Sequence, residues 1–206
     1  GNIMSIYIAR HGETDSNKNR IMQMPGDPLS VNGQKQAALL ALRMKELNIG
    51  HIICSDYQRT QQTAQKVSEQ TGIKTELTPL LRERNFGLLR GQSYNDFNFD
   101  PFALDYVPED GESWQVFAER VTLAWKHITQ IASSHNTNIL VVTHGLVCQV
   151  LLRQQLSNPN DVKSLSDFGN TALTKVTNQS PWPIEFLNCT QHLDEGGVKI
   201  NKGGRV

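Results

Sequence analysis

Cysteines are few in this sequence, and it contains no long apolar run. The three cysteines, Cys54, Cys148 and Cys189, are odd in number and far apart, a pattern that fits neither a disulfide framework nor a paired zinc-binding motif. The longest apolar region, residues 139–152, is interrupted by polar residues, so no membrane span is expected. The first residues have neither the basic start nor the apolar core of a signal peptide. These absences predict a cytoplasmic protein.

An excess of charge of either sign is also absent. Lys plus Arg and Asp plus Glu number 20 each, which gives a formal net charge of zero. Because nucleic-acid-binding and membrane-surface proteins usually carry a basic field, neither partner is expected. A length of 206 residues is typical of one domain, and the sequence predicts a single domain over 1–206. A chain of this length buries about 70% of its unfolded surface when it folds, so it needs neither a disulfide nor a metal for stability.

Short apolar strands alternate with amphipathic helices along most of the chain. Strands are predicted at 5–9, 51–54, 74–77, 138–142, 171–177 and 184–189, and helices at 31–47, 58–70, 113–133 and 146–156. This alternation predicts an α/β fold, a three-layer α/β/α sandwich with a mainly parallel central sheet. An acidic and aromatic segment, 92–112, is predicted to form a small inserted cap. The tail from about 191 to 206 has no periodicity and is predicted to be mobile.

Two of the predicted strands end in the same dipeptide, His-Gly. The first leads into Arg10-His11-Gly12, and the strand at 138–142 leads into Thr143-His144-Gly145. Ligands of parallel α/β sheets bind at the carboxyl ends of the strands, and glycine lets the backbone N–H groups approach a ligand. A third strand, 51–54, leads to Arg59 in the first turn of a helix, which favours anions. All three segments are therefore expected at one edge of the sheet.

The imidazoles of His11 and His144 and the guanidinium groups of Arg10 and Arg59 together predict a phosphate pocket. Arginine matches phosphate oxygens with two parallel hydrogen bonds, and imidazole can act as a nucleophile or a donor. A single histidine after a strand is more often structural, but two such strand ends with two arginines favour a site. No two His or carboxylate residues have an accepted metal-ligand spacing, so neither a metal nor a cofactor is predicted.

The segment Arg10-His11-Gly12-Glu13-Thr14, with Asn17, resembles the signature of the histidine phosphatase (phosphoglycerate mutase-like) superfamily. Further landmarks follow in the order that this family requires: Ser55-Asp56 with Arg59-Thr60, Leu81-Arg82-Glu83-Arg84-Asn85-Phe86-Gly87 with Gly91, Asp110-Gly111-Glu112-Ser113, and Thr143-His144-Gly145. The resemblance spans about residues 5–177. It implies an enzyme of the phosphomonoesterase type that acts on a small-molecule phosphomonoester.

The resemblance also implies a role for each of the catalytic candidates. His11 would take the phosphoryl group as a phosphohistidine, while Arg10, Arg59 and His144 would surround the phosphate. Glu83 would protonate the leaving oxygen and later deprotonate the attacking water; the alternative for this residue is a surface ion pair with a neighbouring arginine. The candidate substrate-binding residues are Asn17, Gln23, Arg84 and Gly145.

Three functions remain open from the sequence. The short connection after Gly91 carries no basic residue, which favours a metal-independent phosphatase that acts on a small phosphorylated metabolite. The resemblance implies that cofactor-dependent phosphoglycerate mutases use a longer, basic insertion; the run 83–87 nevertheless resembles the mutase branch. A non-catalytic module that binds phosphorylated ligands is the third alternative, but it would need neither nucleophile nor acid. The oligomeric state also stays open, with a homodimer among the options.

The composition of the cap also suggests a substrate preference. Residues 92–112 hold six acidic and five aromatic residues and no Lys or Arg. If the acids face the pocket, they repel a negatively charged leaving group, and the aromatics stack on a flat or cationic one. We therefore expect neutral, aromatic or cationic leaving groups to be preferred. Arg84 would instead favour a negatively charged leaving group if it binds a substrate carboxylate.

Overall fold

The computed structural model describes residues 3–158, 167–194, 196–200 and 203–206, and its strands form one six-stranded sheet in the order β3-β2-β4-β1-β5-β6. The strands are β1 (Ser5–Arg10), β2 (Ile49–Ser55), β3 (Thr75–Thr78), β4 (Asn138–Thr143), β5 (Leu173–Thr177) and β6 (Ile184–Cys189). The helices are α1 (Asp15–Lys18), α2 (Val31–Lys45), α3 (Gln58–Thr71), α4 (Trp114–Ser134) and α5 (Gly145–Gln154).

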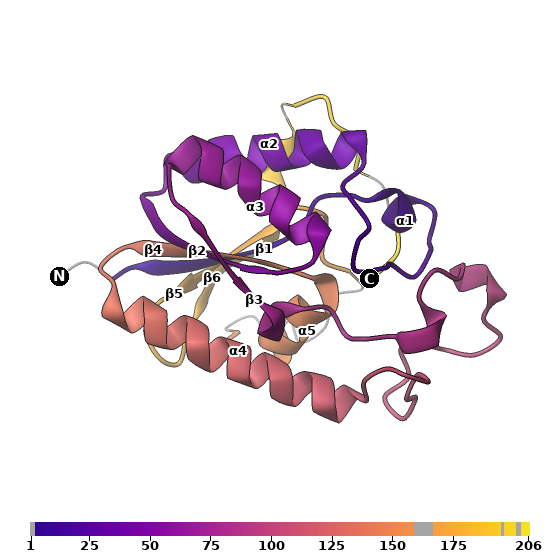
Figure 1. Ribbon diagram of the computed structural model, residues 1–206. Helices are drawn as coiled ribbons and strands as arrows, with labels where there is room; N and C mark the ends of the chain where they lie inside the picture. The colour runs from indigo at the N-terminus through magenta and orange to yellow at the C-terminus, as the bar shows by residue number, and fades with distance from the viewer. Residues whose placement is uncertain (1–2, 159–166, 195, 201–202) are drawn as a thin grey trace.

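The sheet is parallel through β3, β2, β4 and β1, and the two strands beyond β1 are antiparallel. Helices α2 and α3 cover one face, and α4 and α5 cover the other (Figure 1). Because both faces are covered, the central strands β1 and β4 consist almost entirely of buried residues. This arrangement confirms the predicted α/β/α sandwich with a mainly parallel sheet.

Local signals set the helix boundaries close to where the sequence predicts them. The Ser30 hydroxyl accepts a hydrogen bond from the Gly33 N–H and begins α2, and Ser113 begins α4 in the same way. Helix α3 ends at Gly72, whose φ of 74° is left-handed. The sequence analysis missed α1, because four residues are too few to show a helical period.

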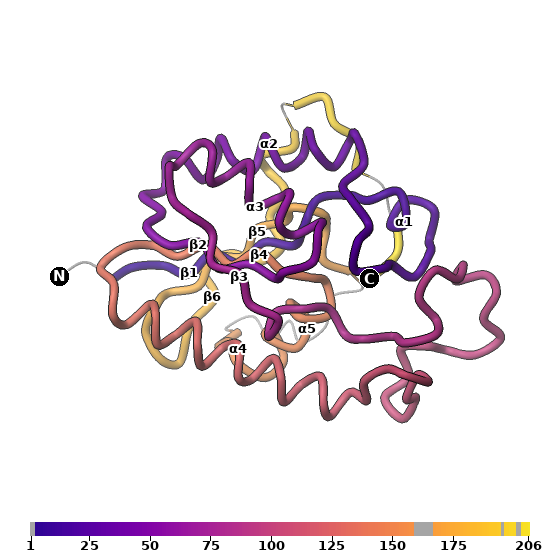
Figure 2. Tube along the Cα trace, viewed as in Figure 1, coloured from indigo at the N-terminus to yellow at the C-terminus, as the bar shows by residue number. Residues whose placement is uncertain are grey.

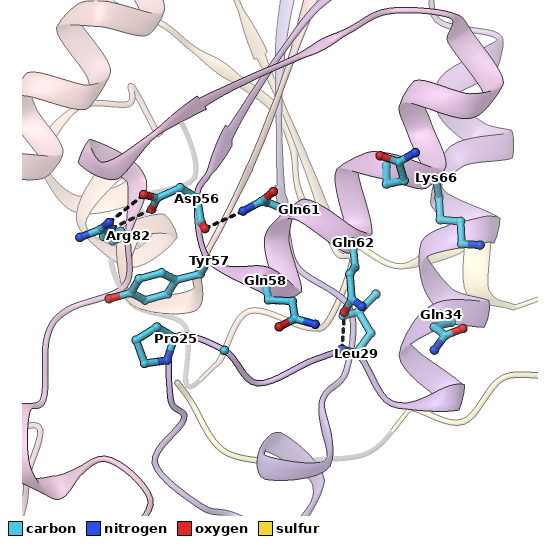
Figure 3. A pocket seen from close by; sticks show the side chains of 12 residues that line it. Pro25, Leu29, Gln34, Asp56, Tyr57, Gln58, Gln61, Gln62, Lys66 and Arg82 are labelled. Carbon is cyan, nitrogen blue, oxygen red and sulfur yellow. Dashed lines mark hydrogen bonds and ion pairs between the residues drawn. The ribbon is translucent and has the colours of Figure 1, made fainter.

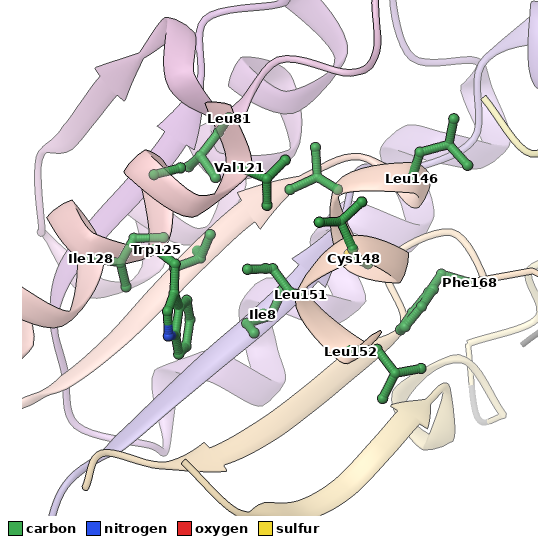
Figure 4. Close-up of a cluster of buried hydrophobic side chains, with 14 of the residues drawn as sticks. Ile8, Leu81, Val121, Trp125, Ile128, Leu146, Cys148, Leu151, Leu152 and Phe168 are labelled. Carbon is green, nitrogen blue, oxygen red and sulfur yellow. The ribbon is translucent and has the colours of Figure 1, made fainter. Parts of the chain in front are cut away.

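The hydrophobic core lies in two layers, one on each side of the sheet. On the side shown in Figure 4, Ile8 of β1 packs beneath Trp125 and Ile128 of α4 and Leu151 of α5. Burying such a side chain contributes roughly 1.5–3 kcal/mol. Cys148 lies in the same layer, and burial raises the pKa of its thiol to about 12, so it behaves as a small apolar residue.

The segment 92–112 forms a lobe beyond the sheet edge, drawn in magenta in Figure 1. Its aromatic rings pack on one another and on the core: Phe102 lies 5.6 Å from Phe86 and 6.0 Å from Tyr94 between ring centroids. Five of its six acidic residues are exposed, and the sixth, Glu112, is paired with Arg120. The aromatic residues therefore attach the cap, and most of its negative charge faces solvent.

Within the described ranges, no helix is long and apolar enough to cross a membrane. The sequence predicts a mobile tail over 191–206, but the structure shows Leu193 and Val206 buried at 3% exposure each. Their burial depends on contacts with residues far away in the chain, and a search for local periodicity cannot detect such contacts.

Candidate active site

The carboxyl ends of β1 and β4 and the start of α3 bring the candidate catalytic residues together. Arg10 is the last residue of β1, His144 is the N-cap of α5, and Arg59 lies in the first turn of α3. The imidazole centroids of His11 and His144 are 5.3 Å apart. All four residues, and Glu83 with them, are at most 4% exposed.

Hydrogen bonding assigns the tautomer of His11. Its Nδ1 lies 2.7 Å from the Gly12 carbonyl oxygen, which can only accept, so Nδ1 carries the proton. The Nε2 atom therefore holds a lone pair, and the Arg59 Nε–H donates to it over 3.3 Å. Burial, followed by the charges of Arg59 and Arg10, holds the pKa of His11 well below 6.5. The imidazole is neutral at pH 7, as a nucleophile requires.

The imidazole of His144 is held through its Nε2 atom. The Ser55 hydroxyl, which accepts from the Tyr57 N–H, lies 2.8 Å from this nitrogen. The other ring nitrogen, Nδ1, is buried and has no hydrogen-bond partner among the described residues. Burial, with the charges of Arg59 and other groups nearby, holds the pKa of His144 well below 6.5.

Arg10 and Arg59 are held in place by hydrogen bonds to backbone carbonyl groups, and each keeps N–H groups free to donate to a ligand. Arg10 donates from Nη1 to the Phe168 carbonyl (2.6 Å) and from Nη2 to the Gly204 carbonyl (3.0 Å), while its Nε is buried and unpartnered. Arg59 donates from Nη1 to the Met24 carbonyl over 3.0 Å. Burial lowers the pKa of Arg59 to about 10, so it remains charged at neutral pH.

Buried side-chain nitrogen atoms without a hydrogen-bond partner gather around this site. They are Arg10 Nε, His144 Nδ1, Gln23 Nε2 and Arg84 Nη1. Gln23 and Arg84 line a small cavity together with Glu83 and Arg59. An unsatisfied buried donor costs about 1–3 kcal/mol, so a cluster of such donors is typical of a site that receives an anion.

Glu83 is a buried carboxyl group held by two backbone N–H groups. Its Oε1 accepts from Arg84 N (3.0 Å), and its Oε2 accepts from Leu146 N (3.1 Å). Burial raises the pKa of Glu83, although these two hydrogen bonds and the nearby arginines act against the shift. The group is therefore more readily protonated than an ordinary glutamate, which suits a proton donor.

Arg120 of α4 holds the loop that carries Glu83. Its Nη1 donates to the carbonyls of Leu80 and Arg82, and its Nη2 donates to the Glu83 carbonyl over 3.3 Å. The same guanidinium makes two hydrogen bonds to the carboxylate of Glu112. Burial acts to raise the pKa of Glu112, but the hydrogen bonds from Arg120 and a backbone N–H hold it below its usual range.

Arg84 attaches the cap to the site. It donates from Nε to the Glu112 carbonyl (3.0 Å) and from Nη2 to the Tyr106 carbonyl (2.7 Å), and its guanidinium lies 4.3 Å from the Trp114 ring centroid. Only Nη1 is left for a ligand. None of the cap's acidic residues lines the small cavity beside Glu83, so the expected preference for cationic leaving groups has no support in this lining.

The other candidate binding residues lie at the same edge. The Asn17 Nδ2 faces the carbonyls of Gly204 (3.5 Å) and Val206 (3.4 Å). Gln23 accepts from the Thr14 hydroxyl through Oε1, which leaves its Nε2 as the free donor. A Cβ added at Gly145 would come within 2.6 Å of the Arg205 carbonyl, so the close packing at this turn requires glycine.

The sequence analysis did not assign several residues of the site. Ser55 is the last residue of β2 and Tyr57 lies two residues beyond it, so the rule for strand ends could have found them. Arg90 lines the cavity beside Glu83 and donates to the Tyr57 hydroxyl over 2.8 Å. Residues 203–206 carried no signal, because they reach the site only through the tertiary fold.

A wide cleft of the structure lies away from these residues. It has a volume of about 780 Å³ and lies beside α3, where glutamines such as Gln58 and Gln62 line it (Figure 3). It contains neither histidine of the site nor Glu83. The cavity beside Glu83 holds only about 10 Å³, so chemistry, not volume, identifies the candidate site. Across the described residues, no group of three or more His, Cys, Asp or Glu could hold a metal ion.

Comparisons with known proteins agree with this geometry. The family model of the histidine phosphatase superfamily (branch 1) matches residues 6–190. A protein of Yersinia enterocolitica named "Probable phosphoglycerate mutase GpmB" is 31% identical, over 93% of this chain and 96% of its own length. The phosphoglycerate mutase of Bacillus anthracis is 25% identical with a TM-score of 0.81, covering 95% of this chain and 97% of its own. A mycobacterial glucosyl-3-phosphoglycerate phosphatase shares the fold, with a TM-score of 0.77 at 24% identity, over 90% of this chain and 99% of its own.

Proposed function

The chain belongs to the histidine phosphatase superfamily, and from this membership we propose that it is a metal-independent phosphomonoester hydrolase with a phosphohistidine intermediate at His11. The observation that carries the proposal is the tautomer of His11. Its unprotonated Nε2 lies among buried donors without partners, next to a carboxyl group whose pKa is raised. The substrate is a small phosphomonoester.

In the first step, the Nε2 lone pair of His11 attacks phosphorus while the bond from phosphorus to the leaving oxygen breaks. Glu83 gives its proton to that oxygen, which departs as an alcohol. Arg10 Nε, Arg59 and His144 Nδ1–H donate to the phosphoryl oxygens, whose charge they stabilise. Because these donors are already oriented, little reorganisation is needed as the transition state forms.

In the second step, water attacks the phosphohistidine. Glu83, now a carboxylate, takes a proton from the water, and the P–N bond breaks to release inorganic phosphate. His11 recovers its lone pair, and Glu83 recovers its proton, so the cycle balances without another reactant. The division of one difficult displacement into two is ordinary nucleophilic catalysis.

The alternative is a phosphoglycerate mutase, in which a substrate hydroxyl takes the place of water. The names of the relatives favour it. Arg84 and Arg90 also favour it, because they line the cavity beside Glu83 and their positive charge suits a substrate carboxylate. Against it, the cap contributes no Lys or Arg, and Arg84 uses two of its donors on the cap's own carbonyls. These observations favour hydrolysis.

The two functions are separated by a panel of phosphomonoesters assayed with EDTA present. Release of inorganic phosphate is measured beside the interconversion of 3- and 2-phosphoglycerate, with His11→Asn as the control for contaminating enzymes. Phosphate release that depends on His11 supports the hydrolase. Interconversion faster than phosphate release would support the mutase, and loss of activity with EDTA would reveal a metal.

A further inference from the structure

Residues 203–206 lie at the active-site edge, although they are far from His11 in the sequence and outside the segment 6–190 that matches the family. In Figure 2 the last part of the trace runs beside α1, next to the ends of the central strands. The family match therefore does not extend to these residues.

Gly204 contacts two of the candidate phosphate donors. Its carbonyl accepts from Arg10 Nη2 at 3.0 Å and from Asn17 Nδ2 at 3.5 Å, and its N–H donates to the Asn17 carbonyl at 2.8 Å. A Cβ at this position would come within 2.6 Å of the Tyr94 hydroxyl oxygen, so the close approach requires glycine. The segment is thus fixed against α1 and the end of β1.

The next two residues connect the segment to the cap. The Val206 N–H donates to the Tyr94 hydroxyl, which in turn donates to the Val206 carbonyl, each over 3.3 Å. The guanidinium of Arg205 lies 4.8 Å from the centroid of the Phe102 ring. Residues 203–206 therefore bridge the phosphate donors and the cap, which are the two sides of the site.

Val206 lies at the small cavity beside Glu83, where the proposed mechanism puts the leaving group. It is 3% exposed and lines the cavity of about 10 Å³ together with Glu83 and Arg59. Glu83 must reach the leaving oxygen, so the rest of the leaving group extends into this cavity. A group of more than a few atoms would meet Val206.

We propose that residues 203–206 form a wall of the leaving-group pocket and that Val206 limits the size of the leaving group. The inference rests on the proposed function and deepens it. A small alkyl leaving group needs only a small shift of Val206, whereas a bulky ester has to displace the whole segment and break its contacts with Tyr94 and Asn17. Selectivity for size then comes from a segment outside the family match.

The test compares ethyl phosphate with 2-phenylethyl phosphate, two alkyl esters that differ in size. In Val206→Ala, we expect the ratio of kcat/KM for the large ester to that for the small one to rise about tenfold, the usual effect of a small change in pocket volume. Val31→Ala is the matched control, because Val31 is 72% exposed and does not line the cavity beside Glu83. An unchanged ratio in Val206→Ala, or an equal rise in the control, would overturn the proposal.

Gly204→Ala is the second variant, since its added methyl group displaces the segment from Tyr94. The ratio should rise here too, while kcat/KM for ethyl phosphate falls because Arg10 and Asn17 lose a contact. Gly26→Ala adds the same methyl group where no atom lies within 4 Å, and it should change neither value.

A binding experiment separates failure of this inference from failure of the proposed function. The dissociation constants of ethylphosphonate and 2-phenylethylphosphonate, neither of which can be hydrolysed, are measured by calorimetry in the wild type and Val206→Ala. A gain in affinity confined to the larger ligand supports the wall even if the wild type hydrolyses neither ester. Equal effects on both ligands, or no binding of either, would contradict it.

Discussion

Ser55 Oγ lies 2.8 Å from His144 Nε2, and this contact holds the imidazole in place. The Tyr57 N–H donates to the same hydroxyl and fixes it at the end of β2. The other ring nitrogen, Nδ1, is left without a partner and is the atom that donates to a phosphoryl oxygen in the proposed reaction. A residue that does not touch the substrate thus prepares one that does.

Ser55→Ala should therefore weaken transition-state binding without unfolding the protein. Loss of one hydrogen bond of about 0.5–1.5 kcal/mol leaves the His144 ring less firmly oriented, so kcat/KM should fall by up to roughly tenfold. Steady-state kinetics measure the loss. Ser133→Ala on the exposed face of α4 is the control, and a Ser55→Ala enzyme with wild-type kcat/KM would contradict this assignment.

His11→Asn should abolish the covalent intermediate. Brief incubation of the wild type with a 32P-labelled substrate should trap an acid-labile, alkali-stable phosphoprotein, as expected for phosphohistidine, and the variant should trap none. His135→Asn changes an exposed histidine and should leave the label intact. Label that persists in His11→Asn would place the nucleophile elsewhere.

Glu83→Gln keeps the shape of the side chain but removes its transferable proton. The kcat/KM of alkyl phosphates, which reports the first step and whose leaving groups need a proton, should fall on the order of 10²–10⁴-fold. Aryl phosphates should lose less, because their leaving groups are stable as anions. An equal loss for both classes would argue against proton donation by Glu83.

The pH dependence of kcat/KM follows from two shifted groups. His11 attacks only when unprotonated, and its pKa is lowered, so activity should persist well below pH 6.5. Glu83 donates only when protonated, and its pKa is raised, so activity toward alkyl phosphates should decline as pH rises through that pKa. In Glu83→Gln, the part of the decline that comes from Glu83 should disappear. Ionisation of the substrate affects the pH profiles of the wild type and the variant equally, so it does not account for a difference between them. The same decline in the variant would assign it to another group.

Arg120 should affect both stability and the acid step. Arg120→Ala leaves the largely buried Glu112 without its partner, which should destabilise the fold by roughly 3 kcal/mol. Arg120→Lys keeps the charge but cannot reach the three loop carbonyls at once, so Glu83 should be misplaced. Thermal unfolding of Arg120→Ala measures the loss of stability. In Arg120→Lys, kcat/KM should fall more for alkyl phosphates than for aryl phosphates. An equal fall for both classes would leave Arg120 with a structural role alone.

The sequence by itself predicted the architecture and the chemical centre. Ser30 begins a helix through a local hydrogen bond, and the apolar runs before His11 and His144 are long enough to form buried strands. Parallel strands end at one edge, so the two His-Gly turns had to meet once the sheet was recognised. Each of these inferences depends on neighbours in the sequence or on a general rule of sheet geometry.

Only the tertiary structure decided which atoms face one another. The orientation of the His144 ring depends on Ser55, which is 89 residues away, and the position of Glu83 depends on Arg120. The cap's charge was visible in the sequence, but its direction was not, because aromatic packing turns the acids outward. Val206 lies beside Glu83 for the same reason: hydrogen bonds and apolar contacts between distant segments form wherever folding brings them together, and no local pattern encodes them.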